Sequence, residues 1–309
     1  MNVFINGSNG TTGLRIVQRL SQRPDVTLLS LPEAARKDAQ AQAELAAKAD
    51  VTFLCLPDEA SRELIALLGD HQGRVLDTST AFRTDSRFAY GFPELSAAHE
   101  AAVRSAVRVA VPGCHASGAL ALLYPLLATG ALNPDAALSL TSLTGYSGGG
   151  KKMIAEYEAP DRAPALSSPT PYAVTQAHKH LPEITHVSGL RNPPVFLPIV
   201  DDYYCGMVVA LPLHASQLAK PLSLRDIGDL YRAHYAGKPL MRVLSPNAEP
   251  TVPANALAGS DLMQVWVTGN DERMIAYARF DNLGKGASGA AIQCMNLMMG
   301  LDAATGLTV

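Results

Sequence analysis

A run of three evenly spaced glycines near the N-terminus constrains the fold of this chain more than any other feature. Gly7, Gly10 and Gly13 follow an apolar segment at 3–5 and open an amphipathic segment at 12–21. A strand, a glycine turn and a helix in that order begin a nucleotide-binding β-α-β unit, because glycines let a pyrophosphate approach the backbone and the helix start offers free N–H groups. The spacing departs from the usual Gly-x-Gly-x-x-Gly, and a tight turn without a ligand is the alternative.

The residues of this turn are the predicted phosphate-binding residues of a dinucleotide site. Side-chain donors stand between the glycines and add to the backbone donors. The predicted set is Gly7, Ser8, Asn9, Gly10, Thr11, Thr12 and Gly13.

Short apolar segments alternate with helical segments over the first third of the chain. Strands are expected at 3–5, 26–31, 51–54, 74–76 and 107–111. Helices are expected at 12–21, at 58–68 with Asp58 as the N-cap, and after Cys114. This order predicts a doubly wound, Rossmann-type α/β domain with a parallel sheet and right-handed crossovers.

From about residue 135 the pattern changes to strand-like segments, several of which alternate apolar and polar residues. Only 223–235 is a clear helix there, the proline-rich segment 159–173 is expected to be a loop, and 284–301 returns to helix. We predict a dinucleotide-binding domain at 1–114, completed by a C-terminal helix at 284–309. The remaining 115–283 is predicted to be an α+β catalytic and oligomerisation domain with a mixed or antiparallel sheet.

Composition restricts the class of partner. The 309 residues carry a net charge of -3 with no extended basic cluster, which argues against nucleic acid and anionic membranes as partners. The longest apolar run, 119–127, is far shorter than the roughly 20 residues of a membrane helix. The four cysteines form no Cys-x-x-Cys pair, so a reducing cytoplasm is expected. An exposed sheet in the second domain would favour a homo-oligomer, either a dimer or a tetramer.

Cys114 has the sequence position of a nucleophile. It follows Pro-Gly at the point where a predicted parallel strand passes into a helix. A helix N-terminus stabilises a thiolate, and doubly wound folds bind their ligands at the carboxyl ends of the strands. A buried structural cysteine is the alternative, and Cys55, inside an apolar strand, is assigned that way.

The end of the second predicted strand favours NADPH over NADH. Ser30 is followed by Glu33 and then by Arg36 and Lys37. A serine and two cations suit a 2′-phosphate, whereas an inward-pointing Glu33 would oppose it. Arg36 and Lys37 are equally compatible with a solvated helix face.

Several motifs together give a resemblance that runs in order along nearly the whole chain. They are GSNGTTG at 7–13, YGFPEL at 90–95, PGCHASG at 112–118, GYSGGGKKMIAEYE at 145–158, HKHLPEI at 178–184 and NLGKGASGAAIQCMNLMMGL at 282–301. In these motifs the sequence closely resembles the N-acetyl-gamma-glutamyl-phosphate reductases, in particular the shorter subgroup of that family.

The resemblance implies an NADPH-dependent reduction of an acyl phosphate to an aldehyde in arginine biosynthesis. By resemblance, Cys114 is the nucleophile that forms a thioester with the γ-acyl group of N-acetyl-glutamyl phosphate. The acid-base histidine of the family falls in HKHLPEI, which supplies His178 and His180. We expect only one of the two to face Cys114. A metal-binding His-x-His pair and a pair of surface histidines are the alternatives. No third ligand is suggested by the spacing, and no metal is expected.

Further candidates surround these residues in the sequence. Arg83 is a candidate for a substrate carboxylate or phosphate, although Ala81 stands where the longer subgroup has an acid. The glycine-rich segment at 145–152 offers Ser147 and Lys151 to the substrate. Asn282 and Gly286 are candidates for the nicotinamide end of the cofactor, with close helix-sheet packing as the alternative.

Three rival functions remain compatible with parts of the sequence. Aspartate-semialdehyde dehydrogenases and the aminoadipyl-phosphate enzyme that acts on a carrier protein share the chemistry and the fold. The former differ around the cysteine, and the latter would be expected to show a basic docking surface. A non-catalytic dinucleotide sensor would share the glycine turn but would not need Cys114.

Overall fold

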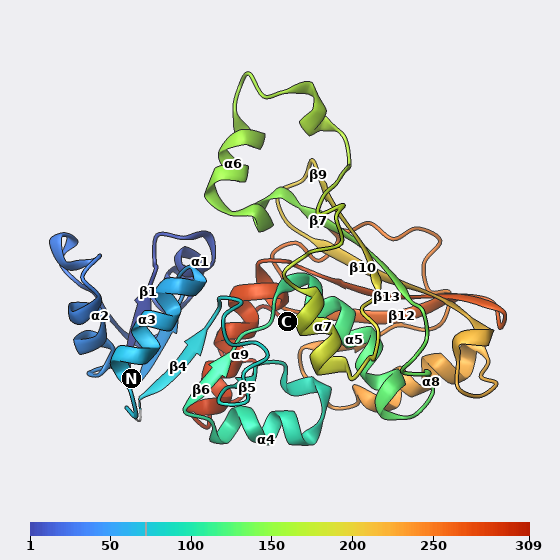
Figure 1. The fold of residues 1–309 in the computed structure, drawn as a ribbon, viewed down its shortest axis with the longest axis horizontal. Helices are drawn as coiled ribbons and strands as arrows, with labels where there is room; N and C mark the ends of the chain where they lie inside the picture. The colour runs from blue at the N-terminus through green and yellow to red at the C-terminus, as the bar shows by residue number, and fades with distance from the viewer. Residues whose placement is uncertain (72) are drawn as a thin grey trace. The chain divides into compact units, whose positions relative to one another are not determined.

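A computed structural model describes residues 1–71 and 73–309, which form two compact units. The first unit comprises 1–113 and 287–307, and the second comprises 114–286 and 308–309. Each unit has its own sheet, and Figure 1 shows the elements of both. Among the described residues, no helix is both long enough and apolar enough to cross a lipid bilayer.

The first unit is built on a six-stranded sheet in which every pairing is parallel. The strand order is β2-β1-β3-β4-β6-β5, so the chain winds outward from β1 in both directions as the doubly wound prediction requires. The strands are β1 (Asn2–Asn6), β2 (Thr27–Leu29), β3 (Val51–Leu54), β4 (Arg74–Asp77), β5 (Ala89–Tyr90) and β6 (Arg108–Ala110).

Helices cover both faces of this sheet, because successive strand residues point to opposite sides. Val3 and Ile5 of β1 pack into one apolar cluster with residues of α1 and α9, whereas Phe4 packs into another with residues of α2 and α3. The helical elements are α1 (Thr11–Leu20), η1 (Glu33–Ala35), α2 (Ala39–Ala46), α3 (Asp58–Leu68), η2 (Pro93–Leu95), α4 (Ala97–Ser105) and α9 (Gly289–Met298).

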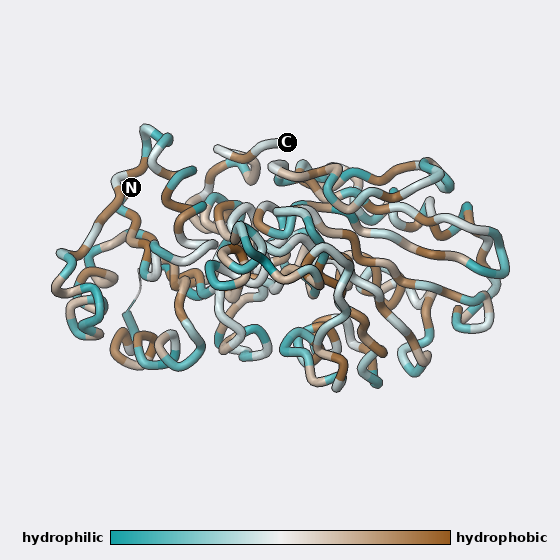
Figure 2. The backbone as a smooth tube through the Cα atoms, turned by 90° about the horizontal axis from the view of Figure 1, so that it is seen from above, coloured by the Kyte–Doolittle hydropathy of each residue, from teal (hydrophilic) through white to brown (hydrophobic). Residues whose placement is uncertain are grey.

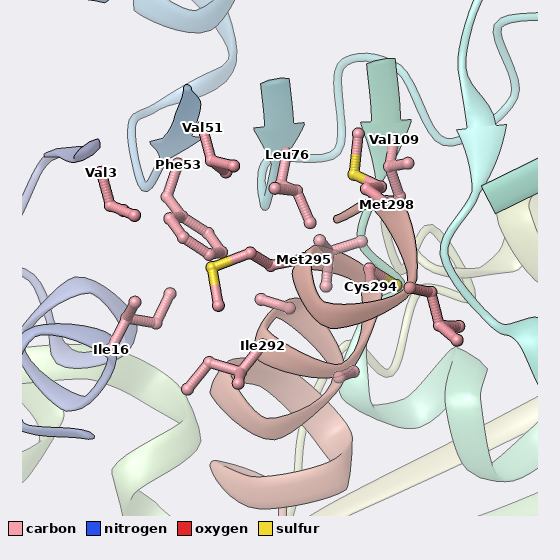
Figure 3. Close-up of a cluster of buried hydrophobic side chains, with 14 of the residues drawn as sticks. Val3, Ile16, Val51, Phe53, Leu76, Val109, Ile292, Cys294, Met295 and Met298 are labelled. Carbon is pink, nitrogen blue, oxygen red and sulfur yellow. The ribbon is translucent and has the colours of Figure 1, made fainter. Parts of the chain in front are cut away.

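The C-terminal helix α9 packs against the core of the first unit. Ile292, Met295 and Met298 of α9 lie among side chains of the strands, including Phe53 and Leu76 (Figure 3). All ten residues of α9 are buried. A segment almost three hundred residues from the N-terminus therefore fills the same hydrophobic cluster as β1.

The second unit is built on a seven-stranded mixed sheet of order β11-β12-β13-β10-β7-β9-β8. The β7–β9 and β11–β12 pairs are parallel, and the other pairs are antiparallel. Hydrophobic colour runs along its strands in Figure 2, and hydrophilic colour marks the turns that join them. The strands are β7 (Ser139–Gly145), β8 (Thr170–Pro171), β9 (Val195–Asp201), β10 (Met207–His214), β11 (Met241–Val243), β12 (Met263–Gly269) and β13 (Arg273–Phe280).

The helix α5 (Cys114–Ala128) packs closely on β10 and β13 of this sheet. A Cβ atom added to Gly118 would lie 2.4 Å from Cγ2 of Val209, so the approach requires glycine at this position. The remaining helical elements of the unit are η3 (Tyr146–Gly149), α6 (Gly150–Glu158), η4 (Pro164–Ser167), α7 (Leu181–Ser188), η5 (Ala215–Gln217), α8 (Leu224–His234) and the π-helical η6 (Gly284–Ser288), whose last two residues belong to the first unit.

Three local predictions were wrong. The N-cap of α3 is Pro57, and the carboxylate of Asp58 instead accepts hydrogen bonds from the backbone N–H and the hydroxyl of Thr80. The helices α6 and α7 were missed because glycine and proline stand at their starts. The predicted loop at 159–173 contains η4 and the short strand β8. By contrast, the helix predicted at 223–235 is present as α8, which Ser223 caps in a capping box with Asp226.

Candidate active site

Cys114 is the first residue of α5, as the sequence predicted. The residue is partly exposed, and the thiol is not in a disulfide. A Cβ atom added to Gly286 would lie 3.0 Å from the Cβ of Cys114, so the turn at 284–286 passes directly beside the cysteine. This short distance supports the alternative that Gly286 is needed for close packing.

Four aromatic rings surround the ring of His115, the residue that follows Cys114. The ring centroids of His178 and His180 lie 5.3 Å and 5.5 Å from that of His115, and Phe196 of β9 lies 5.4 Å away. The Tyr172 ring lies 6.1 Å away. We call these residues, with Ser142 and Cys114, the histidine cluster.

The rings of His178 and His180 lie side by side, and both lie against the ring of His115, the residue that follows Cys114. Their ring centroids are 4.7 Å apart. The backbone N–H of Leu181 donates to the carbonyl of His178, and His180 has helical φ and ψ angles. The chain turns here to start α7, and this turn brings both imidazoles to the histidine cluster.

The two imidazoles have different hydrogen bonds. Nδ1 of His178 accepts the backbone N–H of His180 at 3.1 Å, so the proton of the neutral ring is on Nε2. His178 is half-buried, whereas His180 is only 5% exposed. Burial lowers the pKa of His178 to about 4, and the charge of Lys179 acts in the same direction. His178 is therefore a neutral N–H donor at neutral pH.

The His115 ring is buried and uses both of its nitrogens. Nδ1 lies 2.7 Å from the hydroxyl oxygen of Ser142 on β7, and Nε2 lies 2.6 Å from the hydroxyl oxygen of Tyr172. Burial lowers the pKa of His115 to about 3, with His178 and Lys179 as further causes. This ring is neutral throughout the physiological range.

Ser147 and Asn282, predicted for different ligands, are hydrogen-bonded to each other. Nδ2 of Asn282 donates to the Ser147 hydroxyl at 3.0 Å, and Oδ1 of Asn282 accepts the backbone N–H of Gly206 at 2.8 Å. Both side chains are buried. Lys151, in contrast, lies on the exposed side of α6.

The glycine turn forms the link between β1 and α1. Gly7 has φ +84°, and a Cβ atom there would lie 2.2 Å from the carbonyl oxygen of Cys55. A Cβ atom on Gly13 would lie 2.4 Å from the carbonyl oxygen of Gly7. The fold alone therefore requires both glycines. A Cβ atom on Gly10, the N-cap, would have only one neighbour, 3.4 Å away, so packing does not demand glycine at that position.

The start of α1 fits a dinucleotide phosphate. Gly10 makes no side-chain cap, which leaves the N–H groups of the first turn for a ligand. The hydroxyl of Thr11 is buried and has no hydrogen-bond partner among the described residues. Ser8 and Thr12 are partly exposed beside it, and Asn9 is exposed. A buried hydroxyl without a partner at a helix N-terminus can donate a hydrogen bond to an anion bound there.

The other predicted residues of the first unit lie at the ends of its strands. Ser30 directly follows β2, and Arg36 and Lys37 directly follow η1. All three residues are exposed. Arg83 is buried, and its guanidinium donates from Nε to the carbonyl of Val111 and from Nη2 to that of Thr78.

Sequence reasoning missed His115, Ser142 and Tyr172. His115 stands next to Cys114 in the sequence, and this adjacency was the one available signal. Tyr172 lies in the segment assigned as a loop, and Ser142 is one polar residue of an alternating strand. Among the residues that the structure describes, no group of three or more His, Cys, Asp or Glu side chains could hold a metal ion.

Comparisons with known proteins agree with the two units. A family model described as "Semialdehyde dehydrogenase, NAD binding domain" matches residues 2–103, and one described as "Semialdehyde dehydrogenase, dimerisation domain" matches residues 114–282. Two solved aspartate semialdehyde dehydrogenases share the fold. Form II from Vibrio cholerae has a TM-score of 0.75 at 17% identity over 97% of this chain and 98% of its own, and the Candida albicans enzyme with NADP has 0.69 at 16% over 96% and 98%.

The two-domain fold and the cysteine at the head of α5 define an oxidoreductase of the semialdehyde dehydrogenase class. Curated relatives narrow the assignment. The chain is 40% identical to N-acetyl-gamma-glutamyl-phosphate reductase 2 of Nostoc sp. over 99% of its length and 98% of the relative. It is 42% identical to N-acetyl-gamma-glutamyl-phosphate reductase of Rhizobium leguminosarum bv. trifolii over 96% and 98%. The chain belongs to the N-acetyl-gamma-glutamyl-phosphate reductase family.

The neutral state of His115 predicts a pH dependence of stability. Between about pH 3 and about pH 6.5 the unfolded chain binds a proton at His115 that the folded chain does not, so the free energy of unfolding falls as the pH falls. Replacing His115 by Gln removes this proton. From about pH 6 to about pH 5 the variant should lose about 1 kcal/mol less than the wild type, as measured by urea unfolding. Parallel curves for the two proteins would contradict the assignment.

Proposed function

We propose that this protein reduces N-acetyl-L-glutamyl 5-phosphate to N-acetyl-L-glutamate 5-semialdehyde and phosphate with NADPH, as a step of arginine biosynthesis. The observation that carries the proposal is the identity of about 40% with reductases of that name over nearly the full length of both chains. Cys114 at the N-terminus of α5, beside a cluster of three histidines, supplies the chemistry that such a reaction needs.

Cys114 is the proposed nucleophile. Its thiolate attacks the acyl carbon, the bond from that carbon to the phosphate oxygen breaks, and a thioester remains on the sulfur. NADPH supplies the hydride that reduces this thioester. The resulting thiohemiacetal breaks down when its C–S bond cleaves, which releases the aldehyde and restores the thiolate. Covalent attachment replaces one difficult reduction by two easier steps.

His180 is the proposed acid-base group, and His178 a fixed hydrogen-bond donor. A group that gives a proton to the thiohemiacetal oxygen and takes it back must change its protonation state. The low pKa of His178, about 4, and the bond to its Nδ1 keep that ring neutral with its proton on Nε2. These constraints favour His180, which the sequence alone could not distinguish from His178.

The first unit is the proposed dinucleotide-binding domain. The N–H groups and the Thr11 hydroxyl at the start of α1 would hold the pyrophosphate, together with the rest of the glycine turn. Ser30, Arg36 and Lys37 would hold the 2′-phosphate that distinguishes NADPH from NADH. Asn282 and Gly286 are proposed for the nicotinamide end.

Arg83, Ser147 and Lys151 are proposed to bind the anionic groups of the substrate. Arg83 is anchored by two backbone carbonyls, and its charge suits a carboxylate or a phosphate. Ser147 is held by Asn282. Lys151 is an exposed cation in the first turn of α6.

We further propose a homo-oligomer of two or four chains in the cytoplasm. The match of residues 114–282 to a dimerisation domain supports the oligomer. None of the four cysteines, all of which the structure describes, is in a disulfide, which fits a reducing compartment.

Replacing Cys114 by Ser should abolish reduction while leaving NADPH affinity unchanged, since a serine hydroxyl is not ionised at neutral pH. We expect kcat to fall by about 1000-fold or more. Cys294→Ser is the control, because this buried thiol of α9 donates to the carbonyl of Gly91 and a hydroxyl can do the same. Activity of Cys114→Ser within about tenfold of wild type would end the covalent mechanism. The assay runs in reverse with semialdehyde, NADP and phosphate, comparing N-acetylated with free amino-acid aldehydes.

His180→Asn and His178→Asn should differ in their effect on kcat. Loss of the acid-base group should cost about 100-fold to 1000-fold at position 180. An asparagine at position 178 can still accept the backbone N–H and present an N–H donor, so we expect a loss of about tenfold or less. Steady-state kinetics at saturating substrate measure both. A larger loss at 178 than at 180 would reverse the roles.

Replacing Arg36 and Lys37 together by Ala should weaken NADPH binding more than NADH binding, because only NADPH carries the 2′-phosphate. We expect the ratio of the two Kd values to shift by about tenfold, or about 1.4 kcal/mol. Lys48→Ala removes another exposed cation of the same unit and serves as the control. An unchanged ratio, measured by fluorescence titration, would exclude the two cations from cofactor selection.

A further inference from the structure

A chain of two hydrogen bonds runs through the histidine cluster from Ser142 through His115 to Tyr172. Ser142 is fully buried in β7, His115 is buried in α5, and Tyr172 is half-buried after β8. None of the three residues was assigned a role by the motifs, and none belongs to the steps proposed above.

The direction of this chain follows from the burial of Ser142. The Ser142 hydroxyl has a single hydrogen-bond partner in the part of the chain that the structure describes, the Nδ1 atom of His115. If Nδ1 carried the proton, the Ser142 hydroxyl proton would have no acceptor, and a buried polar proton without an acceptor costs about 1–3 kcal/mol. Ser142 therefore donates to Nδ1, and the proton of the neutral ring is on Nε2.

This tautomer determines what Tyr172 can do. Nε2–H of His115 donates to the Tyr172 oxygen, so the proton of the Tyr172 hydroxyl is free to donate to a third group. Burial raises the pKa of Tyr172, and the charge of Cys114 raises it further, so the phenol stays protonated at neutral pH. Tyr172 is thus hydrogen-bonded to the residue that follows Cys114, and its own hydroxyl proton has no acceptor among the described residues.

His115 does not serve as a base in this arrangement. Its pKa of about 3 makes it a poor proton acceptor at neutral pH. The chain therefore orients a proton without transferring it, which separates its role from that of His180.

We propose that Ser142 and His115 position Tyr172 as a fixed hydrogen-bond donor to the carbonyl oxygen of the acyl group on Cys114, which gains negative charge as the tetrahedral species forms. Tyr172 is then a catalytic residue, and Ser142 and His115 are positioning residues. The inference rests on the proposed covalent role of Cys114. A donor whose direction is set before the reaction stabilises developing charge at no cost of reorganisation during it.

The first test measures the tautomer without any activity. In protein labelled with ¹⁵N at histidine, the His115 resonances are identified by their absence in His115→Gln. The inference requires a protonated, pyrrole-type Nε2 and an unprotonated, pyridine-type Nδ1 at neutral pH. The opposite pattern would overturn it, because Tyr172 would then have to donate its proton to Nε2.

The second test is a double-mutant cycle on Tyr172 and Ser142. Tyr172→Phe should lower kcat by about 100-fold with the KM of the acyl phosphate within about threefold, since the hydrogen bond strengthens only in the transition state. Ser142→Ala removes the donor to Nδ1 and allows His115 to populate the tautomer protonated on Nδ1. In that tautomer the Tyr172 hydroxyl donates to Nε2 and is not available to the substrate, so kcat should fall by about fivefold. The double variant should be no slower than Tyr172→Phe alone.

A matched control is Tyr277→Phe, which removes a hydroxyl from β13, where the ring packs beside Trp266. Its kcat should equal that of the wild type. Multiplicative losses in the cycle, or an unchanged kcat in Tyr172→Phe, would overturn the inference. An active Cys114→Ser would instead overturn the covalent function, so the two failures are distinguishable.

Discussion

The candidate active site depends on burying one imidazole without its charge. The His115 ring packs among His178, His180 and Phe196, and each of its nitrogens has a hydroxyl partner. A buried ring with an unpaired nitrogen would be destabilising, and a buried imidazolium more so. The neutral His115 ring, hydrogen-bonded at both nitrogens, thus connects α5 to Ser142 of β7 and to Tyr172 after β8. These two hydrogen bonds fix the position of the residue that follows Cys114.

Close approach of backbone elements is the second constraint, and it explains where glycine is required. Gly118 lets α5 lie directly on β10, and Gly286 lets the chain pass beside Cys114. At the start of the chain, Gly7 is required by the nearby carbonyl of Cys55, and Gly13 by the carbonyl of Gly7. Packing therefore explains two of the three glycines of this turn. The proposed phosphate site would use the N–H groups at the start of α1, which packing leaves without partners among the described residues.

Much of the first unit was predictable because its signals are local. Apolar segments of the correct length gave β3 and α3 with their observed limits, and the order of elements gave the parallel sheet. The second unit was harder. Its helices α6 and α7 begin at glycine and proline, and tertiary packing, not local propensity, makes them helical. The hydrogen bonds of Ser142 and Tyr172 to His115 could not be predicted, because their local sequences do not indicate a partner that is distant along the chain.

The sequence by itself determined the fold class, the family and the position of the cysteine, since these depend on the order of residues along the chain. Only the tertiary structure decided which groups gather around His115, next to Cys114, and in which protonation state. His178 and His180 converge because the backbone turns between them, and the His115 tautomer depends on a serine on another element. Proximity and desolvation set hydrogen bonds and pKa values, and both arise only when segments distant in sequence pack together.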